Sequence, residues 1–368
     1  MNSRIIFMLV AFSILIGISY FTAKMYSVGF RFNGQTTKFT FLAFLLVPLL
    51  FIASMIMSRS AHWGIGSFGY TVLQVISGFG LYLFFGAIIL GVILTIGALT
   101  NTTIPVVVPL AVFALSILIG VIGLIQARYI VVTPYTVTLQ NAPESWNGKT
   151  AVLVTDTHFG LVNAKAFSDK VISKIISIQP DFVLHAGDFY DGPNIDTLPI
   201  TESWSGLTSS IPVFYAPGNH EGYGTYNTFI KSARDANITV LEDNKVLYDG
   251  VQIAGITYRD GKESVGATQA IEGLALDRTV PSILINHPPT SLPAIDAAGI
   301  DLMVSGHTHN GQFWPLNYAT RAVYGIYSYG LNAYKSAQVL TSRGVGTFGP
   351  PFRTFNQSEL VLITFKTK

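Results

Sequence analysis

Residues 150–160 read TAVLVTDTHFG, an apolar run that ends in an aspartate and a histidine. A nearly continuous apolar run of this length is typical of a β-strand that is buried on both faces. The stretch that follows, AKAFSDKVISKIISI, places apolar residues at Phe167, Val171 and Ile175, which is the spacing of an amphipathic helix. A buried strand followed by such a helix indicates an α/β layered domain.

Similar apolar runs alternate with helix-like stretches through the second half of the chain. The further strand candidates are DFVLHAGD, IPVFYAPGN, ITVLE, VQIAGI, SILINH and DLMVSGH. Five polar residues stand at or just past the ends of such runs: Asp156, Asp188, Asn219, His287 and His307. In open α/β sheets, ligands bind outside the carboxyl ends of the strands. We therefore expect these five side chains to share one rim of the domain.

This rim holds more metal-binding side chains than a single ion requires. The candidates are Asp156, His158, Asp188, Asn219, His220, His287, His307 and His309. In D-x-H and H-x-H, alternate side chains of an extended segment lie on one face and can reach one ion. Oxygen and imidazole donors suit Mn²⁺, Fe or Zn²⁺, and the chain has no cysteine to supply a thiolate. The number of candidates predicts two divalent metal ions that share a bridging carboxylate.

Taken in order, D-x-H, G-D, G-N-H-E, a strand-end histidine and G-H-x-H resemble the calcineurin-like metallophosphoesterase superfamily over about residues 135–365. The resemblance implies a C-terminal α/β double-sheet sandwich with a two-metal site. It assigns Asp156, His158 and His309 to one ion, Asn219, His287 and His307 to the other, Asp188 to both as a bridge, and catalytic proton transfer to His220. Residues 340–365 also resemble a membrane-associated bacterial branch, which includes enzymes that cleave the pyrophosphate of a UDP-linked diacyl sugar.

Two residues depart from the usual pattern of this resemblance. Asn310 stands where the branch usually has glycine, and we expect the turn to survive because asparagine tolerates positive φ. Glu221 stands where aspartate is commoner, which leaves the expected ligand set intact. Further candidates near the rim are Tyr190, Asp191 and Tyr223 for the substrate pocket, and Arg343 and Arg353 for phosphate binding or surface ion pairs.

The first half of the chain has a different character. Residues 1–127 contain five basic residues and no acidic residue. Its four apolar runs are 5–21, 39–57, 72–99 and 104–125, each near the roughly 20 residues that cross a bilayer. We therefore predict a four-helix transmembrane domain over residues 1–128 and a catalytic domain over residues 129–368. No acid or histidine lies inside a run, which favours an anchor over a transport path.

The resemblance and the apolar runs together imply a multi-pass membrane enzyme that hydrolyses a phosphodiester or pyrophosphate bond. Two cations would lower the pKa of water between them and supply hydroxide for attack on phosphorus. His220 would then protonate the leaving oxygen as a general acid. Only a few residues separate position 125 from the strand expected at position 129, so the catalytic domain must lie against the bilayer, where a lipid-linked substrate is expected.

The same residues also bear on other functions and on possible partners. The alternatives are a phosphodiesterase that acts on soluble nucleotides and a non-catalytic membrane sensor with a degenerate domain. A metal-dependent amidohydrolase would have no place for G-N-H-E. We see no basic patch interleaved with aromatic residues, so nucleic acid is not an expected partner. Basic residues number three on each side of the predicted membrane domain, so the orientation stays open, as does the oligomeric state.

Overall fold

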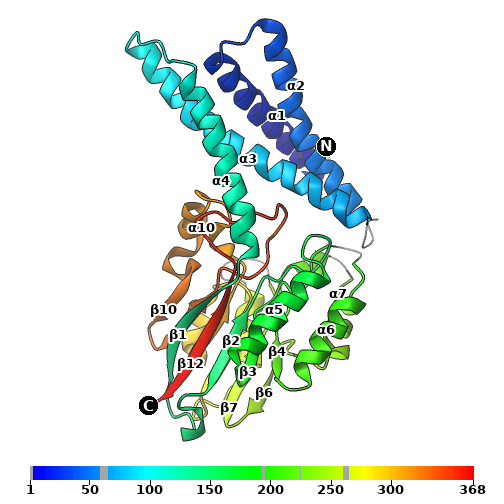
Figure 1. Cartoon of the computed structure of the whole chain (residues 1–368). Helices are drawn as coiled ribbons and strands as arrows, with labels where there is room; N and C mark the ends of the chain where they lie inside the picture. The colour runs from blue at the N-terminus through cyan, green and yellow to red at the C-terminus, as the bar shows by residue number, and fades with distance from the viewer. Residues whose placement is uncertain (1–2, 59–64, 193–194, 224, 260–264) are drawn as a thin grey trace.

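The computed structural model describes residues 3–58, 65–192, 195–223, 225–259 and 265–368. The chain forms a bundle of long helices that stands above a layered α/β domain (Figure 1). In this described part, the bundle consists of α1 (Ser3–Gly29), α2 (Gly34–Met57), α3 (Ile65–Leu99) and α4 (Val107–Arg128). Each of these helices contains one of the four apolar runs found in the sequence, or most of it.

Helices α2, α3 and α4 are long and apolar enough to cross a membrane. The prediction of a multi-pass membrane protein is therefore confirmed. Helix α1 contains the predicted first span, but several side chains of its first half lie outside the described part of the chain. Its role as a fourth span stays a prediction.

Two six-stranded sheets form the centre of the α/β domain in the described residues. The first sheet has the spatial order β1 (Val131–Leu139), β12 (Glu359–Thr367), β2 (Thr150–Val154), β3 (Phe182–His185), β4 (Val213–Tyr215) and β5 (Thr239–Val240). The second has the order β10 (Gly330–Tyr334), β11 (Ala337–Thr341), β9 (Leu302–Ser305), β8 (Ser282–Ile285), β7 (Val251–Gly255) and β6 (Asn244–Tyr248). Strands β2 to β5 run parallel, as do β7, β8, β9 and β11.

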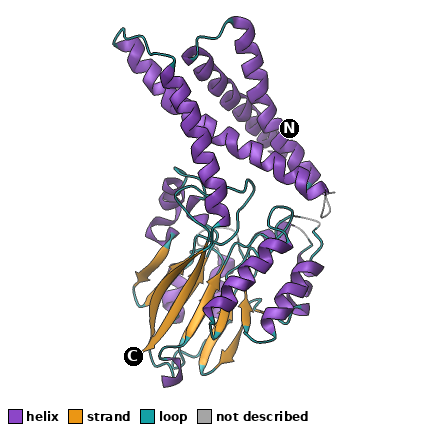
Figure 2. Cartoon of the chain, viewed as in Figure 1, coloured by secondary structure: helices purple, strands orange, loops and turns teal. Residues whose placement is uncertain are grey.

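Helices cover the outer faces of the two sheets (Figure 2). They are α5 (Lys165–Ile178), α6 (Leu198–Thr208) and α7 (Tyr226–Asp235) on the first sheet, and α8 (Val265–Gly273) and α9 (Leu292–Ala298) on the second, with α10 (Asn317–Tyr324) nearer the membrane part. Strand β2 shows the layering, because Val152 and Val154 join the core under the helices while Ala151 and Leu153 join the core between the sheets. Each fully buried valine or leucine contributes about 1.5–3 kcal/mol. The predicted double-sheet architecture is confirmed.

Residues 348–356, which we call the strap, form one of the contacts between the membrane part and the α/β domain. Arg353 donates its backbone N–H to the carbonyl of Gly123 in α4 at 2.9 Å. The strap lies beside the lower half of α4 in Figure 1. Phe352 fills the space next to Gly78 of α3, where an added Cβ would come within 2.2 Å of its ring. The two parts are therefore packed against each other and are not merely tethered.

Candidate metal centre

Five loops bring the predicted site residues to one rim, each loop leaving the carboxyl end of a strand. Strand β2 is followed by Asp156 and His158, β3 by Asp188, β4 by Asn219 and His220, β8 by His287, and β9 by His307 and His309. Both sheets contribute, so the rim spans the top of the sandwich. All eight side chains are buried or half-buried. The structure thus gathers every candidate that the sequence analysis named for the metal site and for proton transfer.

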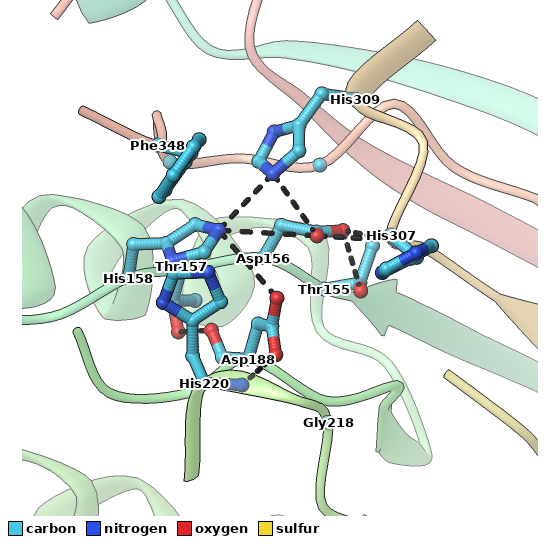
Figure 3. A network of polar contacts seen from close by, with 12 residues as sticks. Thr155, Asp156, Thr157, His158, Asp188, Gly218, His220, His307, His309 and Phe348 are labelled. Carbon is cyan, nitrogen blue, oxygen red and sulfur yellow. Dashed lines mark hydrogen bonds and ion pairs between the residues drawn. The ribbon is translucent and has the colours of Figure 1, made fainter. Parts of the chain in front are cut away.

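The first group consists of Asp156, His158 and His309, whose candidate ligand atoms lie within 4.8 Å of one another. Nε2 of His309 lies 3.1 Å from Nε2 of His158 and 3.3 Å from Oδ1 of Asp156. Nε2 of His158 is also 3.8 Å from Oδ2 of Asp188. Figure 3 shows these side chains converging from three different loops. One cation could contact all of them.

The second group consists of Asp188, His287 and His307. Nε2 of His287 lies 3.1 Å from Oδ2 of Asp188 and 3.2 Å from Nδ1 of His307. The same Nδ1 of His307 is 2.9 Å from Oδ1 of Asn219. Nδ1 of His287 donates to the carbonyl of Ala186 at 2.7 Å, an outer hydrogen bond that leaves Nε2 facing the group. Asp188 therefore lies between both groups.

The protonation of two of these histidines and of Asp188 suits divalent cations. Burial lowers the pKa of His158 to about 4 and that of His307 to about 3, so both imidazoles are neutral and can offer a lone pair. Burial alone would raise the pKa of Asp188, but the charge and hydrogen bond of His287 hold it well below its usual range. Neutral imidazoles and ionised carboxylates are the states that bind metal. His287 differs from His158 and His307: burial would lower its pKa, but the charge and hydrogen bond of Asp188 raise the pKa of His287 to about 9, so a cation bound there would displace its proton. The donor set is consistent with a dinuclear centre.

His220 has a different environment from the other histidines. Its Nδ1 lies 2.9 Å from Oδ1 of Asp191, and its ring meets that of His158 edge to face at 4.5 Å. Burial would lower its pKa, but the hydrogen bond that Nδ1 donates to Asp191 and the charge of Asp188 raise the pKa of His220 to about 9. The ring is therefore protonated at neutral pH. His220, His158 and Asp191 also form a third group of possible ligands, so a metal-binding role for His220 has to be tested.

The backbone of the site loops adopts a conformation that non-glycine residues rarely use. Positive φ angles, between 45° and 69°, occur at Asp156, His158, Asp188, His307 and His309. Such residues each cost roughly 1–3 kcal/mol and persist only where the surroundings enforce them. Asn310 has a φ of 45°, so asparagine adopts the positive φ that we expected of this turn. Five of the seven residues that would hold the ions therefore have this strained conformation.

Glu221 is the residue that ties two of these loops together, and the sequence analysis missed this role. Its fully buried carboxylate accepts backbone N–H bonds from Gly218 at 2.6 Å, Phe189 at 2.8 Å, Tyr190 at 3.1 Å and Asp188 at 3.2 Å. The loops after β3 and β4 are thus joined by one side chain. The available signal was its place in G-N-H-E, directly after His220.

Arg353 corrects another interpretation from the sequence. It is fully buried, so it forms no surface ion pair. Its guanidinium donates to the carbonyls of Gly346 and Arg343, each at 2.7 Å, and one of its nitrogens lies 3.2 Å from Nδ1 of His309. Arg343 itself pairs with Glu359 at 3.0 Å. Arg353 therefore supports the loop of a candidate ligand and also, through its backbone, contacts α4.

A cavity of about 260 Å³ opens beside His220. Its catalytic-domain walls include Asp191, Tyr223 and Phe348, so two of the three predicted pocket residues line it. The third, Tyr190, is buried and stacks on Phe229 in the core. The remaining walls come from the membrane part: Met55 and Ser58 at the end of α2, and Tyr70 of α3. The site therefore faces the membrane helices.

Comparison with known proteins agrees with this geometry. Residues 149–311, which lie within the α/β domain, match the family of calcineurin-like phosphoesterases. The chain is 30% identical to an uncharacterised metallophosphoesterase of Campylobacter jejuni over 224 residues, 59% of this chain and 59% of the relative. It is 24% identical to a transmembrane protein with metallophosphoesterase domain from Bos taurus over 285 residues, 72% of this chain and 64% of the relative.

Among solved structures, one described as GAP50, the anchor in the inner membrane complex of Plasmodium, aligns with a TM-score of 0.36 at 13% identity. That alignment covers 58% of this chain and 79% of the other. The chain spans about three fifths of the length of the Campylobacter relative.

Proposed function

We propose that this protein is a membrane-anchored two-metal phosphoesterase that hydrolyses a phosphodiester or pyrophosphate bond of a lipid-linked substrate. The observation that carries the proposal is the shared cavity beside His220, whose walls come from both the catalytic domain and the ends of α2 and α3. Walls from membrane helices put this cavity within reach of a substrate that is anchored in the bilayer. Residues 340–365 resemble a membrane-associated bacterial branch that includes enzymes cleaving UDP-linked diacyl sugars, which supports the same substrate class.

The roles of the side chains follow from their chemistry. Asp156, His158 and His309 would hold one divalent cation, Asn219, His287 and His307 the other, and Asp188 would contact both; the ions would be Mn²⁺, Fe or Zn²⁺. When bound, such cations polarise phosphoryl oxygens and make water a better nucleophile at neutral pH. His220 carries the proton that the leaving oxygen needs, and Asp191 orients its ring.

Two observations support a reacting group that lies close to the bilayer. Helix α4 ends at Arg128 and strand β1 begins at Val131, so the connection is too short for the domain to move away. The strap adds contacts along α3 and α4, including a 3.1 Å hydrogen bond between the hydroxyls of Tyr82 and Thr354. An amphiphile in the membrane can therefore present its phosphate to the rim.

The test compares two substrates that share one headgroup, using the full chain in liposomes with Mn²⁺. One is a nucleotide diphosphate esterified to a diacyl lipid, and the other is the same nucleotide diphosphate esterified to a short soluble alcohol. We expect a higher kcat/KM for the lipid-linked substrate. Equal constants would favour a soluble-nucleotide phosphodiesterase. No hydrolysis of these or of a generic aryl phosphodiester would favour a non-catalytic sensor.

A further inference from the structure

A second cavity, of about 320 Å³, lies between α1, α2, α3 and the catalytic domain. Phe44, Val47 and Phe51 of α2 form one wall, and Phe313 and Pro350 of the catalytic domain close one end. Its volume falls within the range of roughly 300–1,000 Å³ that is usual for small-molecule sites. It lies outside the metal centre and no candidate ligand lines it.

The walls of this cavity are suited to hydrocarbon. Among the described residues that line it, none is charged. The hydroxyls of Ser19, Thr22 and Ser77 already donate to carbonyl oxygens of their own helices at 2.8–2.9 Å. They therefore offer no free donor to a polar guest. A flexible alkyl chain is the ligand that gains most from such walls and loses no hydrogen bond on entering.

The apolar cavity and the cavity beside His220 are neighbours. On α2, Phe51 lines the first and Met55 the second, which places them on one face, one turn or about 6 Å apart. On α3, Ser77 and Tyr70 are seven residues apart, again on one face. One wall of membrane helices therefore runs from the cavity beside His220 to the apolar cavity.

The strap marks the border between the two cavities. Phe348 lines the cavity beside His220, its ring 5.1 Å from the imidazole, whereas Pro350 lines the apolar one. Two residues of extended chain span at most about 7 Å. Gln312 fixes this border, because its amide nitrogen donates to the carbonyls of Phe348 and Pro350 at 3.0 and 3.1 Å and its amide oxygen accepts from the N–H of Phe348 at 2.9 Å.

We propose that the apolar cavity binds the hydrocarbon chain of the substrate while the phosphate lies at the metal centre across the strap. This inference rests on the proposed function and makes its substrate class narrower. The enzyme would recognise a phosphodiester by the length of its attached chain. The membrane helices would then form a substrate site as well as an anchor.

The experiment uses 4-nitrophenyl methyl phosphate and 4-nitrophenyl decyl phosphate with the full chain in one detergent. In both, water attacks phosphorus, the bond to the nitrophenyl oxygen breaks, and 4-nitrophenolate and the alkyl phosphate are released. The measured quantity is the ratio of the two kcat/KM values. We expect a ratio of roughly ten or more, the low end of what a fitted hydrophobic pocket gives for one methylene.

The variant Ser77→Phe fills the cavity and should bring this ratio towards one. Ile76→Phe is the matched control, because Ile76 directly precedes Ser77 in α3, is 37% exposed and does not line the cavity. This control variant should keep the ratio of the unaltered chain. An unchanged ratio in Ser77→Phe would overturn the inference while leaving the proposed function intact. Absence of hydrolysis for both substrates would instead contradict the proposed function.

A second measurement needs no variant. A decyl phosphate whose chain ends in a diazirine is irradiated with the unaltered chain, and the labelled peptides are identified by mass spectrometry. We expect label on residues 44–51 and 313–316, and competition by unlabelled decyl phosphate. Label confined to lipid-facing positions such as Ile89, which is 52% exposed, would overturn the inference.

Discussion

The carboxylate of Asp191 lies 2.9 Å from Nδ1 of His220. The protonated ring of His220 donates this hydrogen bond, so its other nitrogen, Nε2, carries the proton that can be transferred. An anion in direct contact favours the charged form of an imidazole, which is why the pKa of His220 rises to about 9 against the effect of burial. The pair thus holds both the orientation and the charge state of the proposed acid.

Asp191→Asn should move the alkaline limb of the pH–rate profile. A general acid works only while protonated, so turnover of a substrate with a poor leaving group should fall as the pH rises through the pKa of His220. Without the anion that raises this pKa, the fall should begin at lower pH. The pH dependence of kcat checks this, with Asp235→Asn on the surface of α7 as control. Superimposable profiles would show that Asp191 does not set the charge of His220.

His220→Ala should lower turnover by about 10²–10⁴, the usual contribution of general acid catalysis. The loss should shrink for 4-nitrophenyl esters, because their leaving group is acidic and needs no proton. Metal content, measured by mass spectrometry of the purified protein, should stay near that of the unaltered chain. Loss of metal would identify His220 as a ligand, as its position beside His158 and Asp191 also allows.

Asp188→Asn should remove most of the activity and lower the metal content. The carboxylate lies 3.8 Å from Nε2 of His158 and 3.1 Å from Nε2 of His287, so its charge serves both groups. A neutral amide cannot replace that charge, and the loss of affinity should exceed the roughly 10–100-fold cost of losing an outer hydrogen-bond partner. Calorimetric titration with Mn²⁺ measures it. Full activity after both chelation and this substitution would rule out the two-metal site.

The sequence could predict the rim because each polar residue there follows an apolar strand. Asp156 after β2 is an example: the apolar run specifies a buried strand, and its end specifies the rim. The turn at Asn310 could be predicted, since tolerance of positive φ is a property of asparagine itself. The role of Arg353 could not be predicted, because its partners are mostly backbone carbonyls, which leave no pattern in the sequence.

The contribution of the membrane helices to the site could not be predicted from the sequence either. Hydropathy predicts that a helix crosses the bilayer, but it does not show which face meets the catalytic domain. Met55 and Tyr70 look like ordinary residues near the ends of spans, yet they line the cavity beside His220. Their role depends on packing between segments that are far apart in the chain. Only the fold brings those segments together.

Glu221→Ala should destabilise the protein and weaken metal binding together. It leaves buried backbone N–H groups without an acceptor, at a cost of roughly 1–3 kcal/mol for each that finds no new partner. Glu221→Gln keeps one carbonyl oxygen and should lose less. Thermal unfolding of both variants in detergent, with and without Mn²⁺, checks the order. Equal melting temperatures for the unaltered chain and the alanine variant would show that this carboxylate does not hold the two loops.

Phe352→Ala should weaken the contact between the membrane part and the catalytic domain. The ring of Phe352 is fully buried and lies 5.3 Å from that of Phe79 and 5.6 Å from that of Tyr82, both in α3. Truncating such a phenylalanine usually costs about 3–5 kcal/mol. The loss falls on the interface, so we expect the catalytic domain to unfold separately and at lower temperature than in the unaltered chain.

Calorimetry of the full chain in detergent can resolve this change, and the strap supplies its own control. Phe355 is 68% exposed, so Phe355→Ala removes the same ring from the same segment without opening a buried space. It should leave the transition unchanged. If Phe352→Ala also unfolds in one unchanged transition, the buried ring does not couple the two parts. If Phe352→Ala uncouples the membrane part from the catalytic domain, the preference for a lipid-linked substrate should fall as well. The cavity wall from α2 and α3 would then no longer stay aligned with the metal centre.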